Sequence, residues 1–207
     1  MISAREALKL LQEGNKRFVT GFRSSSSRPS QRQRDKFVEG QNPKAIILGC
    51  SDSRVPAEMI FDQGLGDLFV IRVAGNVVAP SLVASVEFAA ERFETRLVVV
   101  MGHSQCGAVQ ATIEELQLPI AKRSHNMHAI VGRIQPSVES FLDTELKHDS
   151  DQLLEMAIRA NIRSSANHLR HGSPILEDLI EKNGLLVVGT EYSLETGLVD
   201  FFDGLPI

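Results

Sequence analysis

The chain has 207 residues, a net charge of −4 with both signs spread along its length, and 43% hydrophobic residues. This length and composition fit one domain with a sizeable buried core. They show no basic patch for nucleic acid or an anionic membrane surface, and no apolar stretch approaches the roughly 18 residues of a membrane span. The N-terminus passes into a helical pattern without a signal-peptide core, so we expect a cytoplasmic protein, although removal of a leader would leave the same pattern.

The first 40 residues are interpreted as an N-terminal arm. Apolar residues recur at helical spacing over residues 3–18, which predicts one amphipathic helix. A polar stretch with Ser24–Ser27 and Arg28-Pro29 follows, and a short polar helix is expected around Arg32–Glu39. The first helix needs a surface to cover. A partner subunit and the chain's own domain are equally good candidates.

From residue 44 the pattern changes to short apolar runs separated by helical segments. Four runs are apolar throughout or nearly so, as expected for strands covered on both faces: Ala45–Gly49, Leu68–Val73, Leu97–Gly102 and Leu185–Gly189. Helical patterns lie at Ser81–Phe93, 107–117, 127–142, 152–171 and Pro174–Lys182, and Ser81 is the expected N-cap of the first of these.

This alternation predicts an α/β fold with a mainly parallel central sheet flanked by helices. We expect about four parallel strands in the order 2-1-3-4, plus an edge strand and the N-terminal helical arm. The whole chain, 1–207, is interpreted as one domain. Residues 1–40 form its arm, 44–110 its core, and 111–207 a helical region with the final strands.

Both cysteines of the chain follow predicted strands. Cys50 ends the first apolar run, while His103 and Cys106 follow the third. Ligands in parallel sheets gather beyond the carboxyl ends of the strands, so these side chains converge if the two strands are neighbours. Two thiolates and an imidazole leave one tetrahedral position open, as in a catalytic zinc site. A pair of buried, inert thiols is the alternative, and the joint placement with a histidine favours the metal.

Two charged residues follow the first cysteine. Asp52 is close enough in sequence to reach the same metal ion, and Arg54 can hold that carboxylate through paired hydrogen bonds. A surface ion pair worth about 0–1 kcal/mol is the alternative interpretation. Beside a zinc site we favour the functional one.

Two motifs together resemble the paired signature of the β-class carbonic anhydrases: Cys50-Ser51-Asp52-Ser53-Arg54-Val55 and Gly102-His103-Ser104-Gln105-Cys106-Gly107. The similarity runs from about residue 41 to residue 110. The resemblance implies one Zn²⁺ per subunit, held by Cys50, His103 and Cys106, and a functional dyad of Asp52 and Arg54. It also implies a homodimer or a dimer of dimers whose N-terminal helices embrace the partner.

The resemblance further implies a substrate pocket, partly built across the subunit interface. Positions matching Gln41, Phe69, Ala74 and Phe88 would supply one amide donor and an apolar wall, and Gly107 is placed with them. Some bacterial members have a tryptophan three residues before the first cysteine, as part of an inhibitory bicarbonate site. This chain has Ile47 there and no tryptophan, so we do not expect that regulation, although Arg72 matches another residue of that site.

The implied activity is the reversible hydration of carbon dioxide to bicarbonate and a proton. Zinc lowers the pKa of bound water from 15.7 towards roughly 7–8, and the resulting hydroxide would attack carbon dioxide against the apolar wall while Gln41 donates to an oxygen. Paired with Arg54, Asp52 accepts the hydrogen of the hydroxide; moved onto zinc, it acts as a fourth ligand and closes the site. We therefore predict activity that rises with pH, and an inactive four-ligand form below neutrality.

Two other functions remain open from the sequence. Similar scaffolds hydrolyse carbon disulfide or carbonyl sulfide, and a non-catalytic zinc domain used in assembly would keep Asp52 on the metal.

The remaining histidines do not identify a proton shuttle. His168 and His171 stand one turn apart and could bind a second metal ion, but exposure near a helix C-terminus is the better interpretation. Solvation is also favoured for His125 and His128, and His148 has no assigned role.

Overall fold

Five strands form one sheet in the order β2-β1-β3-β4-β5. The structure is a computed structural model that describes residues 2–22, 35, 37–38, 40–116, 118 and 126–206. The strands are β1 (Ala45–Gly49), β2 (Leu68–Arg72), β3 (Leu97–His103), β4 (Leu186–Tyr192) and β5 (Val199–Asp203). The first four run parallel, and β5 pairs antiparallel with β4. The predicted fold class, strand order and edge strand are confirmed.

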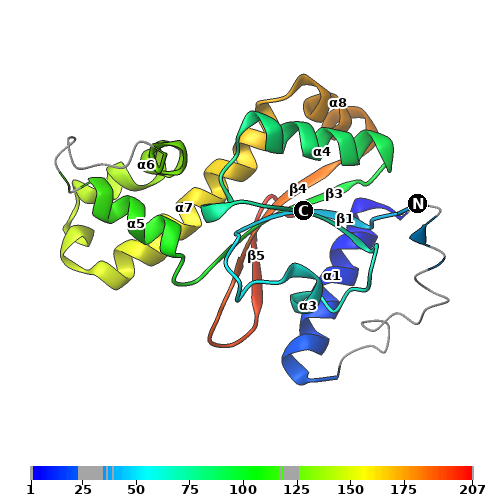
Figure 1. Cartoon of the computed structure of the whole chain (residues 1–207), viewed down its shortest axis with the longest axis horizontal. Coiled ribbons are helices and arrows are strands. Elements are labelled where there is room, and N and C mark those ends of the chain that lie inside the picture. Colours follow the sequence, from blue (N-terminus) through cyan, green and yellow to red (C-terminus); the bar gives the residue numbers. More distant parts are fainter. Residues whose placement is uncertain are drawn as a thin grey trace.

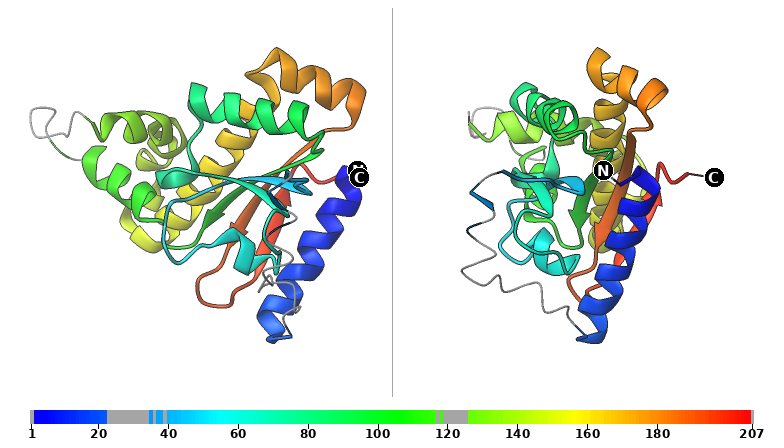
Figure 2. Two further views of the ribbon diagram at one scale, coloured as in Figure 1. Left: turned by 45° about the vertical axis from the view of Figure 1, so that its right-hand side comes forward. Right: turned by 90° about the vertical axis from the view of Figure 1, so that its right-hand side faces the viewer.

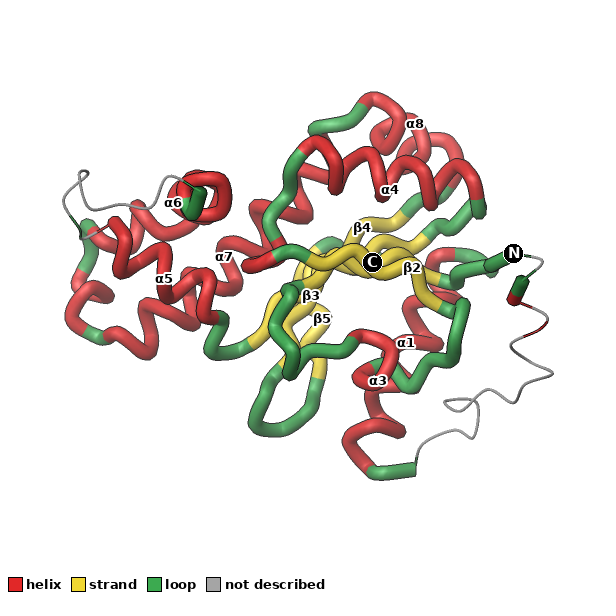
Figure 3. Tube along the Cα trace, in the orientation of Figure 1, coloured by secondary structure: helices red, strands yellow, loops and turns green. Residues whose placement is uncertain are grey.

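Helices cover both faces of the sheet (Figure 1). α1 and α3 lie on one side, α4 and α8 lie on the other, and α5 and α6 pack with α7 beyond the strands. Figure 3 shows the strands as one layer between these helices. The helices are α1 (Ala4–Thr20), α3 (Ala57–Ile60), α4 (Pro80–Arg92), α5 (Gly107–Leu116), α6 (His128–Leu142), α7 (Ser150–His171) and α8 (Pro174–Asn183), with 3-10 turns η2 (Ala74–Asn76) and η4 (Glu145–His148). α3 and the two turns were not predicted, because elements of three or four residues show no periodicity.

The central strands are buried on both faces, which explains their uninterrupted apolar sequence. In β1, Ile46 and Leu48 belong to the core that includes α4, α7 and α8. Ala45 and Ile47, which alternate with them, belong to the core that includes α1 and α3. Successive side chains of a strand point to opposite faces, so one short strand contributes to two cores.

Helix α1 covers its own domain. A capping box between Ser3 and Glu6 starts the helix, and its buried residues pack in one core with Ile47 and Val99 of the sheet. Both views in Figure 2 show α1 running along the sheet. Of the two surfaces considered for this helix, the one that it covers in the described structure is the chain's own domain. Ser24–Ser27, Arg28-Pro29 and most of the helix expected around Arg32–Glu39 lie outside the described residues.

The prediction that Ser81 caps α4 is wrong. The N-cap is Ala79, which makes no side-chain capping bond, and Pro80 occupies the start of the helix. Proline suits this position because its φ is fixed and the N–H that it lacks would have no intrahelical partner. Ser81 therefore lies in the first turn, where its carbonyl accepts a hydrogen bond from the Ser85 hydroxyl.

Within the described residues, no helix is long and apolar enough to span a bilayer.

Candidate metal centre

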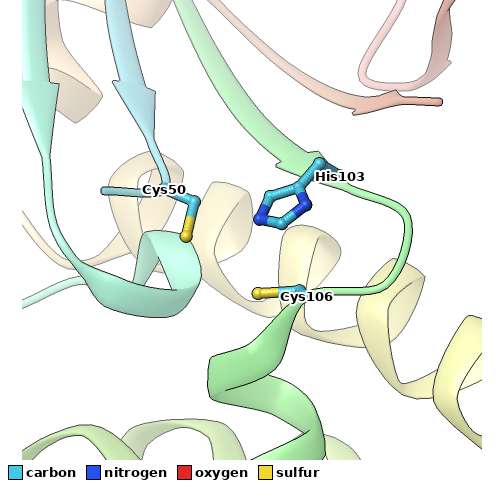
Figure 4. A group of neighbouring side chains, drawn as sticks. All are labelled: Cys50, His103 and Cys106. Atoms are coloured by element: carbon cyan, nitrogen blue, oxygen red, sulfur yellow. The ribbon is translucent and has the colours of Figure 1, made fainter. Parts of the chain in front are cut away.

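Three potential metal-binding side chains meet at the carboxyl ends of two neighbouring strands. Cys50 directly follows β1, His103 is the last residue of β3, and Cys106 directly precedes α5. β1 and β3 are paired in parallel, with Gly49 opposite Met101, so both chain segments leave the same edge of the sheet. Figure 4 shows the two sulfurs and the imidazole ring directed towards one another. One ligand atom from each residue lies within 4.8 Å of the others.

The donor atoms fit a zinc ion. All three residues are buried, with exposures of 5%, 0% and 1% for Cys50, His103 and Cys106. The Nδ1 atom of His103 lies 2.9 Å from the carbonyl oxygen of Ser104, so the tautomer protonated at Nδ1 donates there and leaves a lone pair on Nε2. Nε2 is buried and has no hydrogen-bond partner among the described residues. Such an atom is costly to bury without a partner, and two sulfurs with one imidazole nitrogen are ligands that zinc prefers.

The electrostatics of the pair of thiols favour one thiolate before any metal binds. A hydrogen bond from Cys106 lowers the pKa of Cys50, with smaller contributions from His103 and the N–H of Gly75, while burial opposes the shift. The same hydrogen bond and burial raise the pKa of Cys106. Burial is the largest single effect on the pKa of His103 and lowers it, but the opposing effects of the nearby Cys50 sulfur, the Ser104 carbonyl and Asp52 together outweigh burial, so the net shift is upward. A metal ion that binds here must displace the remaining thiol proton.

Asp52 and Arg54 form the predicted pair of hydrogen bonds beside these residues. Arg54 donates from Nε to Oδ1 at 3.0 Å, from Nη2 to Oδ2 at 2.8 Å, and from its backbone N–H to Oδ1 at 2.9 Å. The side-chain bonds are the main reason that the pKa of Asp52 lies below its usual range. Oδ2 of Asp52 is 3.9 Å from Nε2 of His103. The carboxylate is therefore ionised, held by Arg54 and adjacent to the metal-binding side chains.

Arg72 has a role that the sequence analysis missed. It donates from Nε to the carbonyl of Cys50 at 2.9 Å and from Nη2 to the carbonyl of Asp52 at 2.5 Å. These bonds fix the backbone of the loop that carries Cys50, Asp52 and Arg54. An arginine at the end of an apolar strand was the available signal, but its carbonyl partners depend on the path of the loop.

Ser104 and Gly75 are the other contributors that were missed. The backbone N–H of Ser104 donates to the carbonyl of Tyr192, and its hydroxyl accepts a hydrogen bond of 2.9 Å from the N–H of Leu194. The backbone N–H of Gly75 donates to the Cys50 sulfur at 3.4 Å. These contacts attach the metal-binding segments to the β4–β5 hairpin and to η2.

The residues expected at the substrate pocket separate into two groups. Ala74 lies in η2 next to Gly75, and Gly107 begins α5 directly after Cys106, so both adjoin the metal-binding residues in the chain. Both are exposed.

Gln41, Phe69 and Phe88 lie elsewhere in the single chain. Gln41 lines a cavity of about 740 Å³ together with Phe93, and none of the three metal-binding residues lines that cavity. The rings of Phe69, Phe88 and Phe93 form a cluster with centroids 5.6–6.2 Å apart. Phe88 is 52% exposed.

The other histidines that the structure describes stand outside the metal-binding group. His128 and His168 line a separate cavity of about 780 Å³ between α4, α6 and α7. His168 and His171 are exposed near the C-terminus of α7, and His148 is exposed at the end of η4. His125 lies outside the described residues.

The fold and the centre define an α/β protein with a mainly parallel sheet and a three-ligand site suited to zinc, and comparison with known proteins agrees. The model of the carbonic anhydrase family matches residues 45–199. Carbonic anhydrase 2 of Mycobacterium tuberculosis is 36% identical over 191 residues, which cover 92% of this chain and 89% of the relative. The carbonic anhydrase of Mycolicibacterium smegmatis is 35% identical over 201 residues, covering 94% and 91%.

Solved structures show the same relationship. The β-carbonic anhydrase CafA of Aspergillus fumigatus has a TM-score of 0.75 at 26% identity, covering 85% of this chain and 83% of that one. The β-carbonic anhydrase CcaA also has a TM-score of 0.75, at 28% identity and 95% coverage of both chains. The chain belongs to the β-class carbonic anhydrase family.

Proposed function

We propose that the protein catalyses the reversible hydration of carbon dioxide to bicarbonate and a proton, with one zinc ion per subunit. The observation that carries this proposal is the convergence of Cys50, His103 and Cys106 within 4.8 Å, with the unpaired Nε2 of His103 among the donors. Relatives at 35–36% identity over most of the chain bear the name carbonic anhydrase. When bound, zinc supplies a Lewis acid that makes water nucleophilic near neutral pH.

The Asp52–Arg54 pair orients the attacking water in this proposal. An ionised carboxylate only accepts hydrogen bonds, and the lowered pKa of Asp52 keeps it ionised throughout the neutral range. The two bonds from Arg54 fix the direction of the carboxylate. Asp52 therefore accepts a hydrogen from water and directs the oxygen lone pair away from itself.

The same carboxylate provides a proposed means of closing the site. Asp52 must leave Arg54 before it can serve as a fourth metal ligand, so the open and closed arrangements exclude each other. The hydrogen bonds to Arg54 favour the open arrangement. Hydroxide competes less well with the carboxylate for the metal as pH falls. We therefore predict loss of activity below neutrality.

The substrate pocket is proposed to form between two copies of the chain. It would be lined by Gln41, Phe69, Ala74, Phe88 and Gly107. In the single chain Ala74 and Gly107 adjoin the metal-binding residues, whereas the other three lie elsewhere. Phe88 of α4 packs against Phe69 of the edge strand β2, and such an exposed aromatic side chain is typical of a protein interface. An apolar wall also suits carbon dioxide, which is linear and has no dipole moment.

Rapid-mixing assays of the zinc-loaded protein test the proposal. We expect carbon dioxide hydration, measured with a pH indicator, and little hydrogen sulfide release from carbonyl sulfide or carbon disulfide. Sulfide release without hydration would assign the protein to the alternative hydrolases. Full zinc occupancy with neither activity would instead identify a non-catalytic zinc domain.

A further inference from the structure

Asn161 is a buried amide on a mostly apolar face of helix α7. It lies in α7 with 1% exposure, between the core residues Ile158 and Ile162. Its Nδ2 donates a hydrogen bond of 2.8 Å to the carbonyl of Gly75, 86 residues earlier in the chain. A buried amide is costly unless it is hydrogen-bonded. This hydrogen bond therefore explains why a polar side chain occupies this buried position.

The peptide group between Gly75 and Asn76 is held at both ends. Its carbonyl accepts from Asn161, and its N–H, which belongs to Asn76, donates to the carbonyl of Val73 at 3.1 Å. Both residues of the turn have left-handed backbone angles, with φ of 67° at Gly75 and 44° at Asn76. With that peptide fixed, the preceding N–H, which belongs to Gly75, is directed at the Cys50 sulfur, 3.4 Å away.

Gly75 cannot be replaced to test this arrangement. A Cβ there would lie 2.8 Å from Cδ1 of Ile134 and 3.1 Å from Cβ of Ala108, in a backbone conformation that favours glycine. The variable part of the arrangement is Asn161, because its side chain can be shortened without changing the turn's own sequence.

We infer that Asn161 is a positioning residue for Cys50: it holds the Gly75 turn so that a backbone N–H donates to the metal-binding sulfur. The inference rests on the proposed zinc site. A donor to a ligating sulfur fixes the direction of that sulfur and withdraws electron density from it. Partners of metal ligands typically change metal affinity by about 10–100-fold when they are removed.

The test compares two identical substitutions on one helix. Asn161→Leu removes the donor to Gly75, and Asn167→Leu, the matched control, changes an exposed asparagine of α7 that accepts from Arg170. Zinc affinity is measured by chelator competition on the folded full chain. We expect a loss of about 10–100-fold for N161L and wild-type affinity for N167L. In the cobalt(II) form, the sulfur-to-metal charge-transfer band should shift in N161L alone.

A merely structural role gives a different result. N161L would then unfold at a lower temperature but keep wild-type zinc affinity and the wild-type cobalt spectrum, which would overturn the inference. Asn161→Ala is the second variant, because alanine has a high helix propensity. It should show the same loss of zinc affinity that we expect for N161L.

The unsubstituted protein tests the hydrogen bond directly. In the cadmium-113 form we expect a scalar coupling between the metal and the amide proton of Gly75, and its absence would also overturn the inference. Wild-type protein that fails to bind zinc would instead refute the proposed function, so the two failures are distinguishable.

Discussion

The guanidinium of Arg54 holds the carboxylate of Asp52 through two parallel hydrogen bonds, of 3.0 and 2.8 Å. The side chain of Arg54 is half exposed, whereas that of Asp52 is largely buried. The Asp52 carboxylate faces His103, with Oδ2 3.9 Å from Nε2. This pair therefore links a solvent-facing cation to the buried metal-binding group.

Replacing Asp52 by Asn should greatly reduce turnover and leave zinc content unchanged. The amide keeps the shape of the carboxylate but presents one acceptor oxygen in place of two, and positioned proton acceptors typically contribute about 100–10,000-fold. Carbon dioxide hydration and metal content are measured on the same sample. Asp178→Asn on α8 is the control and should be unaffected. Unchanged turnover in D52N would remove Asp52 from the mechanism.

Replacing Arg54 by Met should raise the pKa of Asp52 towards its ordinary value. The hydrogen bond from Arg54 is the largest cause of the lowered pKa. Carboxyl carbon NMR of the metal-free protein measures the shift directly. An unchanged pKa of Asp52 in R54M would contradict this assignment.

The same substitution has a predicted pH dependence. A carboxyl whose pKa is lowered by folding stabilises the folded state above its ordinary, unfolded pKa, and this stabilisation is lost as pH falls through the lowered pKa. R54M should therefore be destabilised most at neutral pH and least in acid, as followed by urea unfolding. Arg92→Met on α4 serves as the control and should show no such pH dependence.

Replacing Ser104 by Ala should weaken zinc binding. Its hydroxyl accepts from the N–H of Leu194, and its carbonyl accepts from Nδ1 of His103, so the substitution loosens the segment that orients the imidazole. Loss of the hydroxyl should also lower the free energy of unfolding by about 1 kcal/mol. Chelator competition measures the affinity, and Ser104→Thr, which keeps a hydroxyl, should restore it.

Ser193→Ala is the matched control for that experiment. The Ser193 hydroxyl accepts a hydrogen bond from the N–H of Thr196 within the same hairpin. In the described part of the chain it makes no hydrogen bond to a metal-binding residue. S193A should lose a similar amount of stability and keep its zinc affinity. Equal zinc affinity in S104A and S193A would show that Ser104 does not position His103.

Replacing Phe88 by Glu should dissociate the proposed dimer and abolish activity together, because the proposed pocket includes residues of both copies. Sedimentation velocity gives the assembly state, and the hydration assay gives the activity. Ile175→Glu introduces the same charge at an exposed apolar residue of α8 and should change neither. An active F88E protein of unchanged size would refute the proposed interface.

The metal-binding residues could be predicted because Cys50 and His103 directly follow apolar runs and Cys106 lies three residues after His103. Strand topology alone then brings Cys50 and His103 to one edge of the sheet. The contacts of Arg72 and Asn161 could not be predicted, since both donate to backbone carbonyls whose positions depend on tertiary packing. The start of α4 was misplaced because the preference of Pro80 for the first helical position outweighs the capping preference of Ser81.

The most direct test of the account measures zinc content and carbon dioxide hydration together, on native protein, after chelation and after adding back one equivalent of zinc. We predict one zinc ion per chain, loss of activity with the metal, and recovery at one equivalent. Cys50→Ala and Cys106→Ala should recover neither metal nor activity. Full hydration activity in metal-free protein, or full zinc occupancy in either cysteine variant, would contradict the account.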